Sequence, residues 1–140
     1  MSLVAKKQIY QDAVPKVLVI DDDPSFGKIL SHVAQKYELE LTICSSIEEL
    51  SKVPYWQFDI VVMDYDLGYY TGVELSDYFS EYIEFGKQLP VVLISHSEQI
   101  KSEEWTDNIV EFVRKDEGAA HILEMVFEIY TNINQDSKQA

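Results

Sequence analysis

The sequence predicts an α/β protein, a doubly wound five-stranded parallel sheet with helices on both faces. Short runs rich in Val and Ile alternate along the chain with segments of helical periodicity. The runs at 17–20, 60–63 and 91–94 are continuously apolar, as expected for parallel strands buried on both faces. Polar residues interrupt the runs at 39–43 and 109–113, which suits strands at the sheet edges. This division into central and edge strands favours the strand order 2-1-3-4-5 with right-handed crossovers.

The first two helices have clear start signals. Asp23 can cap a helix that begins at Pro24, because proline is favoured at the first helical position. Apolar residues then recur at intervals of three and four along 26–37. Ser46 and Glu49 have the spacing of a capping box and predict a second helix directly after them.

The later helices differ in the strength of their patterns. Thr71 and Glu74 again have capping-box spacing, and apolar residues at helical intervals over 75–83 predict a third helix. Between 97 and 108 no convincing apolar stripe is present, so we expect a short or irregular fourth helix. The last helix has the clearest pattern, a wide apolar stripe over 119–130 that should pack against the sheet.

Length and composition indicate a single domain. The chain has 140 residues, of which 46% are apolar, enough for one globular core. With only 5 Gly and 4 Pro it contains no flexible linker, and it has no repeat or low-complexity tract. We therefore expect a loose N-terminal segment over 1–15, one domain over 16–131 and a loose C-terminal tail over 132–140.

The charge balance narrows the possible partners. Lys and Arg number 11 against 25 Asp and Glu, giving a net charge of -14 that disfavours nucleic acid and anionic membranes. No apolar run approaches the roughly 18 residues of a membrane span, and no secretory signal is recognisable. The single Cys44 cannot form an internal disulfide. We expect a protein without membrane or nucleic-acid contacts, and the cytoplasmic location that we expect rests mostly on its function.

Acidic residues follow the first and third strands, which are neighbours in the predicted sheet. The triplet Asp21, Asp22 and Asp23 follows one strand, and Asp64 and Asp66 follow the other. Two carboxylates about 5 Å apart repel each other by roughly 3 kcal/mol at an effective dielectric constant near 20. A hard divalent cation such as Mg2+ would offset this repulsion. A solvated acidic rim remains an alternative interpretation of Asp23 and Asp66 taken singly.

Two further strand ends carry groups that complement negative charge. Ser95 follows the fourth apolar run with a hydroxyl group, and Lys115 follows the fifth with an ammonium group. Each residue alone is common at a strand end. Together with Asp64 they place a carboxylate nucleophile, a metal site, a hydroxyl and a cation around one point, as phosphoryl transfer to an aspartate requires.

At these residues the chain resembles the receiver domain of two-component response regulators, over roughly 16–130. The resemblance rests on Val-Leu-Val-Ile-Asp-Asp-Asp-Pro at 17–24 and on the segment from Asp64 to Gly72. It implies a flavodoxin-like fold, with Asp64 as the phosphoacceptor, aided by Ser95 and Lys115. The metal ligands that it implies for Mg2+ are Asp21, Asp22, Asp64 and the backbone carbonyl of Asp66.

The resemblance also implies partners and an output. The phosphoryl donor would be a sensor histidine kinase or a phosphotransfer protein. The domain would be no enzyme with a separate substrate, but would promote its own phosphotransfer and dephosphorylation. Ser95 and Phe112 are the expected switch residues. The face of the fourth strand, the fifth strand and the last helix would carry the signal to an unknown output domain or protein, and is also a possible homodimer surface.

Three residues depart from the usual receiver pattern. Gly68 stands four residues after Asp64 where proline is usual, and should loosen that loop. Asp116 follows Lys115 in place of the usual proline, which is compatible with an ordinary trans peptide. His96 replaces a typically small residue and should crowd the site.

Two alternatives stay open. A receiver-like interaction module that is never phosphorylated would tolerate these departures. A phosphatase of the haloacid-dehalogenase type also carries an Asp-x-Asp motif after a strand, as at Asp64 and Asp66, but it usually has a longer chain and a cap region. The 3 scattered histidines and one cysteine support no zinc site, and no motif of a hydrolase triad or a nucleotide-binding loop is present.

Overall fold

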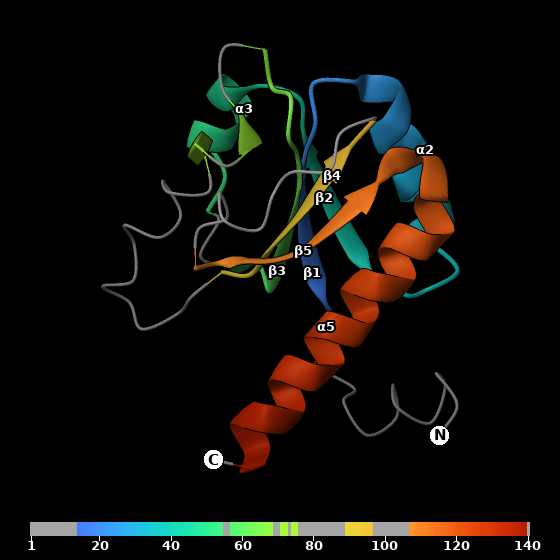
Figure 1. Ribbon diagram of the computed structural model, residues 1–140, viewed down its shortest axis with the longest axis vertical. Helices are drawn as coiled ribbons and strands as arrows, with labels where there is room; N and C mark the ends of the chain where they lie inside the picture. Colours follow the sequence, from blue (N-terminus) through green and yellow to red (C-terminus); the bar gives the residue numbers. More distant parts are fainter. Residues whose placement is uncertain are drawn as a thin grey trace.

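Five parallel strands form the centre of the molecule (Figure 1). The structure is a computed structural model that describes residues 14–54, 57–68, 71–72, 74–75, 89–96 and 107–139, with side chains of the last helix described through Ile133. Within these residues the sheet has the order β2-β1-β3-β4-β5, and every neighbouring pair is parallel, which confirms the predicted topology. The strands are β1 (Lys16–Ile20), β2 (Glu40–Cys44), β3 (Ile60–Asp64), β4 (Val91–Ser95) and β5 (Ile109–Arg114).

Two helices begin where the sequence predicts. Helix α2 (Pro24–Ala34) starts with its proline, and the Asp23 carboxylate accepts a hydrogen bond of 3.0 Å from the Ser25 N–H. Helix α3 (Ile47–Ser51) is capped by the Ser46 hydroxyl, which accepts from the Glu49 N–H at 3.1 Å. The first of these helices ends before the apolar pattern does. Tyr37 lies in the turn after α2 and still packs against the core.

The third predicted helix is described only at its start. The Thr71 hydroxyl accepts a hydrogen bond of 3.2 Å from the Glu74 N–H, and the Thr71 N–H donates to the Glu74 carboxylate at 3.4 Å, so the predicted capping box forms. Most of the predicted third helix, over 76–83, and residues 97–106 of the fourth lie outside the described residues.

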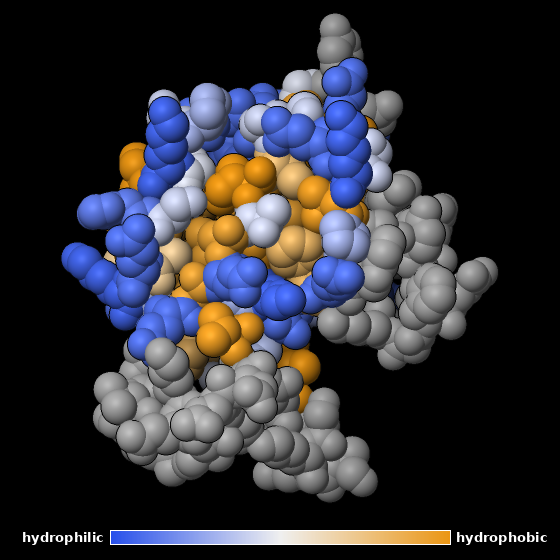
Figure 2. All heavy atoms as spheres, turned by 180° about the vertical axis from the view of Figure 1, so that it is seen from behind, coloured by the Kyte–Doolittle hydropathy of each residue, from blue (hydrophilic) through white to orange (hydrophobic). Residues whose placement is uncertain are grey.

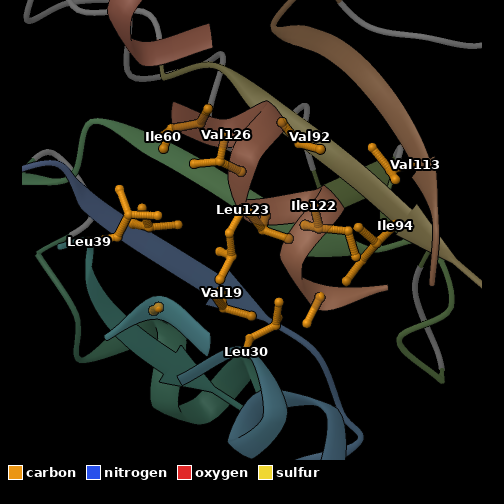
Figure 3. Close-up of a cluster of buried hydrophobic side chains, with 14 residues drawn as sticks. Val19, Leu30, Leu39, Ile60, Val92, Ile94, Val113, Ile122, Leu123 and Val126 are labelled. Carbon is orange, nitrogen blue, oxygen red and sulfur yellow. The ribbon is translucent and has the colours of Figure 1, made fainter. Parts of the chain in front are cut away.

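Alternate side chains of the strands build two apolar clusters, one on each face of the sheet. On one face, Val17 and Val19 pack with residues of α2 and of the long helix α5 (Ala119–Gln139). Figure 3 shows Ile122 and Leu123 of α5 among the strand side chains of this cluster. On the other face, Leu18 and Ile20 pack with residues such as Leu50 of α3. In Figure 1, α2 and α5 accordingly lie on one side of the sheet and α3 on the other.

The edge strands are more open to solvent than the central strands, as predicted, but exposure does not follow the polar positions alone. Leu41 and Ile43 of β2 are half-buried, and Val110 of β5 is exposed. Seen from behind, the molecule shows an apolar area framed by hydrophilic residues (Figure 2), on the side where β2 forms the edge of the sheet. Among the described residues, no helix is long and apolar enough to cross a membrane.

The described residues reach beyond the predicted bounds at both ends, and the division into 1–15, 16–131 and 132–140 stays a prediction. Helix α5 continues to Gln139 and extends beyond the sheet (Figure 1), where a loose tail over 132–140 was expected. Residues 132–139 contain neither Gly nor Pro, so nothing in them interrupts the helical hydrogen bonding. At the other end Pro15 is buried, and its carbonyl accepts a hydrogen bond of 2.9 Å from the Glu40 N–H, so the ordered domain begins before residue 16. The rest of the predicted loose segment, 1–13, lies outside the described residues.

Candidate functional site

The predicted acidic groups meet at the carboxyl ends of β1 and β3. The two strands are hydrogen-bonded neighbours, with Ile20 opposite Met63, so Asp21 and Asp64 follow at adjacent strand ends. Asp21 is fully buried, Asp64 is 5% exposed, and Asp22 lies at the surface. The N–H of Asp21 donates to the Cys44 carbonyl at 3.1 Å, which ties this strand end to β2. The site thus occupies the position where ligands bind to doubly wound sheets.

A single buried lysine lies between the two buried carboxylates. The Nζ atom of Lys115 is 2.7 Å from Oδ2 of Asp21 and 3.3 Å from Oδ2 of Asp64. Only 3% of the lysine side chain is exposed. A short 3₁₀ turn, η4 (Lys115–Glu117), follows β5 and starts at this lysine. Two negative charges therefore share one positive charge in a region from which water is largely excluded.

The crowding of charges changes the acidity of the group at the centre. Burial, followed by repulsion from Asp21, raises the pKa of Asp64 to about 6, although Lys115 and the Asp66 N–H act in the opposite direction. Burial alone would lower the pKa of Lys115, but its contacts with Asp21 and then Asp64 outweigh burial and raise that pKa. The lysine therefore stays charged at neutral pH, and Asp64 is mainly ionised there.

Three carboxylates of this centre fit a divalent metal ion. One oxygen each of Asp21, Asp22 and Asp64 lies within 4.8 Å of the others. Oδ2 of Asp21 is buried and accepts no well-aligned hydrogen bond, despite its short ion-pair contact with Lys115. Oδ1 of the same residue accepts from the Asp23 N–H at 2.9 Å, which fixes the orientation of the carboxylate. An oriented oxygen with spare acceptor capacity beside two other carboxylates suits a hard cation such as Mg2+.

The loop after Asp64 is held close to the site. The Asp66 N–H donates to Oδ1 of Asp64 at 3.3 Å, and the Asp66 carboxylate accepts from the Gly68 N–H at 3.2 Å. Gly68 has a φ of 81°, a left-handed conformation that glycine adopts without strain. Farther along, the Gly72 N–H donates to the carbonyl of Tyr65 at 2.7 Å. The assignment of the Asp66 carbonyl as a metal ligand stays a prediction.

The remaining predicted residues lie at the same edge of the sheet. Ser95 is buried at the end of β4, one residue after Ile94, the partner of Asp64 in the sheet register. His96, the next residue, is exposed. Phe112 of β5 is half-buried against the apolar cluster on the α3 face. The structure therefore brings Asp21, Asp22, Asp64 and Lys115 into one cluster and sets Ser95 at the same strand edge.

One residue of the site was missed in the sequence. The ring centre of Phe26 lies 4.9 Å from Nζ of Lys115. In the sequence, Phe26 counts only as one apolar position of the first helix. The available signal is its place in the first turn of that helix, two residues after Pro24, which itself follows the acidic triplet.

The fold and the acidic centre define the class of this protein, and solved structures share the fold. The chemotaxis response regulator CheY4 of Vibrio cholerae superposes with a TM-score of 0.71 at 20% identity, over 84% of this chain and 99% of that chain. A CheY-like receiver domain protein from Methanospirillum hungatei gives a TM-score of 0.70 at 15% identity, over 89% and 99%. The protein is thus an α/β protein of the CheY-like, flavodoxin-like class.

Sequence comparison then gives the family. The model of the response regulator receiver domain matches residues 17–127, and the chain belongs to this family. Its sequence is 32% identical over 83 residues to the two-component response regulator ORR26 of Oryza sativa subsp. japonica. That match covers 57% of this chain and 14% of the rice protein, so this chain corresponds to a small part of that relative.

Proposed function

We propose that this receiver domain accepts a phosphoryl group on the Asp64 carboxylate from the phosphohistidine of a sensor histidine kinase or phosphotransfer protein. The observation that carries the proposal is the buried centre in which Asp64 and Asp21 share the ammonium group of Lys115. Such a centre holds a carboxylate nucleophile next to a fixed positive charge, where a transferred phosphoryl group would bring further negative charge.

The transfer itself needs few groups. An oxygen of Asp64 attacks the phosphorus atom, a P–O bond forms, and the P–N bond to the donor imidazole breaks. The electron pair of that bond stays on the imidazole nitrogen, which then takes a proton from water. Lys115 and the Asp66 N–H already contact the two oxygens of Asp64 and so orient the nucleophile. The lysine ammonium and the Ser95 hydroxyl are the groups that would hold the phosphoryl oxygens of the product.

Asp21, Asp22 and Asp64, with the Asp66 carbonyl, are the residues that would hold Mg2+. When bound, this ion supplies positive charge that offsets the repulsion between the phosphoryl group and the carboxylates. Binding is supported by the close approach of the three carboxylates and by the spare acceptor capacity of Oδ2 of Asp21.

The output that we infer is a conformational change on the face of β4, β5 and α5. Ser95 would transmit occupancy of Asp64, and the half-buried Phe112 is the expected second switch residue. The same face would meet the unknown output domain or protein, or a second copy of the chain. We place this exchange in the cytoplasm, with self-catalysed phosphotransfer and dephosphorylation in place of turnover of a separate substrate.

A receiver that is never phosphorylated is the second candidate. It is favoured by Gly68 in the loop after Asp64 and by the exposed His96 directly after Ser95. The phosphatase alternative is weaker, because the Asp66 carboxylate, its required general acid, accepts a hydrogen bond from Gly68 within its own loop.

Intact-mass measurement after incubation with acetyl phosphate and Mg2+ tests the proposal. We expect one phosphoryl group on the wild-type protein, stable in acid and labile in base, and none on Asp64→Asn. The exposed Asp116 provides the matched control, since Asp116→Asn should label like the wild type. Equal labelling of Asp64→Asn, or an unlabelled wild type beside a receiver that labels, would contradict the proposal. Turnover of a phosphomonoester would favour the phosphatase.

A further inference from the structure

We propose that Phe26 is a positioning residue that holds the Lys115 ammonium group toward Asp64, an inference that rests on the proposed function. The distance of 4.9 Å from Nζ to the ring centre is within the roughly 6 Å over which a cation is attracted to an aromatic face. The lysine side chain is 3% exposed, and this attraction is stronger for a desolvated cation than for a hydrated one. The ring therefore forms a third contact of the ammonium group, beside the two carboxylates.

The position of the ring is fixed by the start of α2. Oδ1 of Asp21 accepts from the Asp23 N–H, and the Asp23 carboxylate accepts from the Ser25 N–H. These bonds connect the first turn of the helix to the same carboxylate that contacts Lys115. Gly27, the residue after Phe26, is buried so close to β2 that an added Cβ atom would lie 2.9 Å from Cγ2 of Ile43. The helix is thus held tightly against the sheet, and the ring cannot easily move away.

The ring has a property that the two carboxylates lack. Asp21 and Asp64 also belong to the carboxylate cluster that fits a metal ion. Any carboxylate engaged by a cation attracts the lysine less, because part of its charge is then offset. Phe26 is neutral and outside that cluster, so its attraction for Nζ does not depend on the state of the carboxylates. Phe26 would keep the Lys115 ammonium group at Asp64 when the carboxylates of Asp21 and Asp64 are engaged by a cation.

Two substitutions distinguish the effect of the aromatic face on Lys115 from the effect of apolar packing at this position. Phe26→Leu keeps an apolar side chain but removes the ring, and Phe26→Tyr keeps the ring. Proton NMR of the Lys115 ε-methylene group should show an upfield ring-current shift in the wild type and in Phe26→Tyr, and its loss in Phe26→Leu. Affinity for beryllofluoride in excess Mg2+ should fall about 3- to 30-fold in Phe26→Leu and stay within about twofold in Phe26→Tyr. If Phe26→Leu does not fold, Phe26→Met takes its place in both measurements.

Phe127→Leu is the matched control, because it removes another ring that packs against the same apolar cluster. Its beryllofluoride affinity should stay within about twofold of the wild type. The inference is wrong if Phe26→Leu binds as well as this control, or if folded Phe26→Tyr binds as poorly as Phe26→Leu. A wild-type protein that binds no beryllofluoride would contradict the proposed function instead. Crystal structures of the variants then decide alone: an Nζ atom of Lys115 that moves away from Oδ2 of Asp64 in Phe26→Leu but not in Phe26→Tyr supports the inference, and an unmoved Nζ atom in Phe26→Leu overturns it.

Discussion

Ionisation of Asp64 at neutral pH is less favourable in the folded protein than in the unfolded chain. Its folded pKa is about 6 against a usual value of 3.8, so the carboxylate costs stability when it ionises in the fold. Asp64→Asn removes this charge while keeping the shape of the side chain. We expect the substitution to raise the free energy of unfolding at pH 7 by about 1–3 kcal/mol, measured by urea denaturation in chelator. The exposed Asp107 is the control, and Asp107→Asn should change stability by less than about 0.5 kcal/mol.

The same shift fixes how this gain depends on pH. A raised folded pKa means that the folded state binds more protons than the unfolded state between pH 3.8 and about 6. Stability of the wild type therefore falls as pH rises through this window, and the asparagine variant does not show that fall. The difference between the two proteins should be full above pH 6 and vanish below pH 4. A variant that is less stable than the wild type at pH 7 would contradict this electrostatic explanation.

Cys44 offers a second test at the level of one residue. The thiol is buried at the end of β2, and burial raises its pKa to about 11. Because the thiolate is the reactive form, we expect labelling by iodoacetamide at pH 8 to be slow in the folded protein and fast in denaturant. If labelling proceeds through global unfolding, the more stable Asp64→Asn should label more slowly in native buffer. The ratio of the rate in denaturant to the rate in native buffer should therefore rise in this variant. Fast labelling in native buffer would mean that β2 opens locally.

At the level of elements, the close approach of the loop after β3 to the sheet requires that residue 72 has no Cβ atom. A Cβ atom on Gly72 would lie 2.7 Å from the Asp64 carbonyl oxygen and 2.7 Å from Cδ2 of Leu93. Gly72→Ala should therefore lower the free energy of unfolding by about 1–3 kcal/mol and weaken Mg2+ binding, since the loop must move away from the site. Gly68→Asn is the control, because that position is open and asparagine tolerates its positive φ. Equal loss in both variants would refute the steric argument.

The elements that the sequence predicts well are those fixed by local pattern. Central strands carry continuous apolar runs, and strand ends carry the acids and the lysine, so topology and the cluster around Asp64 follow from spacing alone. The contact of Phe26 with Lys115 was missed because it depends on how closely α2 approaches the sheet, which no local pattern encodes. The length of α5 was also missed. Polar residues after Tyr130 end the apolar stripe, but the backbone can continue as a helix without it.

The whole molecule should become more stable when Mg2+ binds, because the carboxylate cluster exists only in the fold. At ten times the dissociation constant, linkage gives about 1.4 kcal/mol, or roughly 3 to 6 °C in melting temperature for a domain of this size. Asp22→Ala should lose most of this shift, since Asp22 is the exposed member of the cluster and does not contribute to the core. Asp107→Ala, at constant ionic strength, should retain it. Equal shifts in both variants would indicate nonspecific binding to the acidic surface.

Phosphorylation should change the conformation of the face formed by β4, β5 and α5 and leave β2, at the opposite edge of the sheet, unchanged. Ser95 lies in β4 beside the Asp64 strand, and β5 pairs with β4 without interruption from Glu111 to Arg114, so a movement of Ser95 would reach Phe112 through neighbouring strands. Phe112 has no hydroxyl group, so its inward and outward orientations would differ mainly by apolar burial, about 1.5–3 kcal/mol for Phe. That difference is enough to shift the two populations at least tenfold.

Hydrogen exchange with and without beryllofluoride measures this prediction. We expect altered protection between His96 and Tyr130 in the wild type, with β2 unchanged, because β2 is separated from β4 and β5 by β1 and β3 in the sheet. Asp64→Asn should show no difference under the same conditions, since beryllofluoride needs the carboxylate. Unchanged exchange between His96 and Tyr130, with Asp64 occupied according to fluorine NMR, would mean that the signal leaves by another face. Altered protection confined to β2 would indicate that the signal leaves by the opposite edge of the sheet.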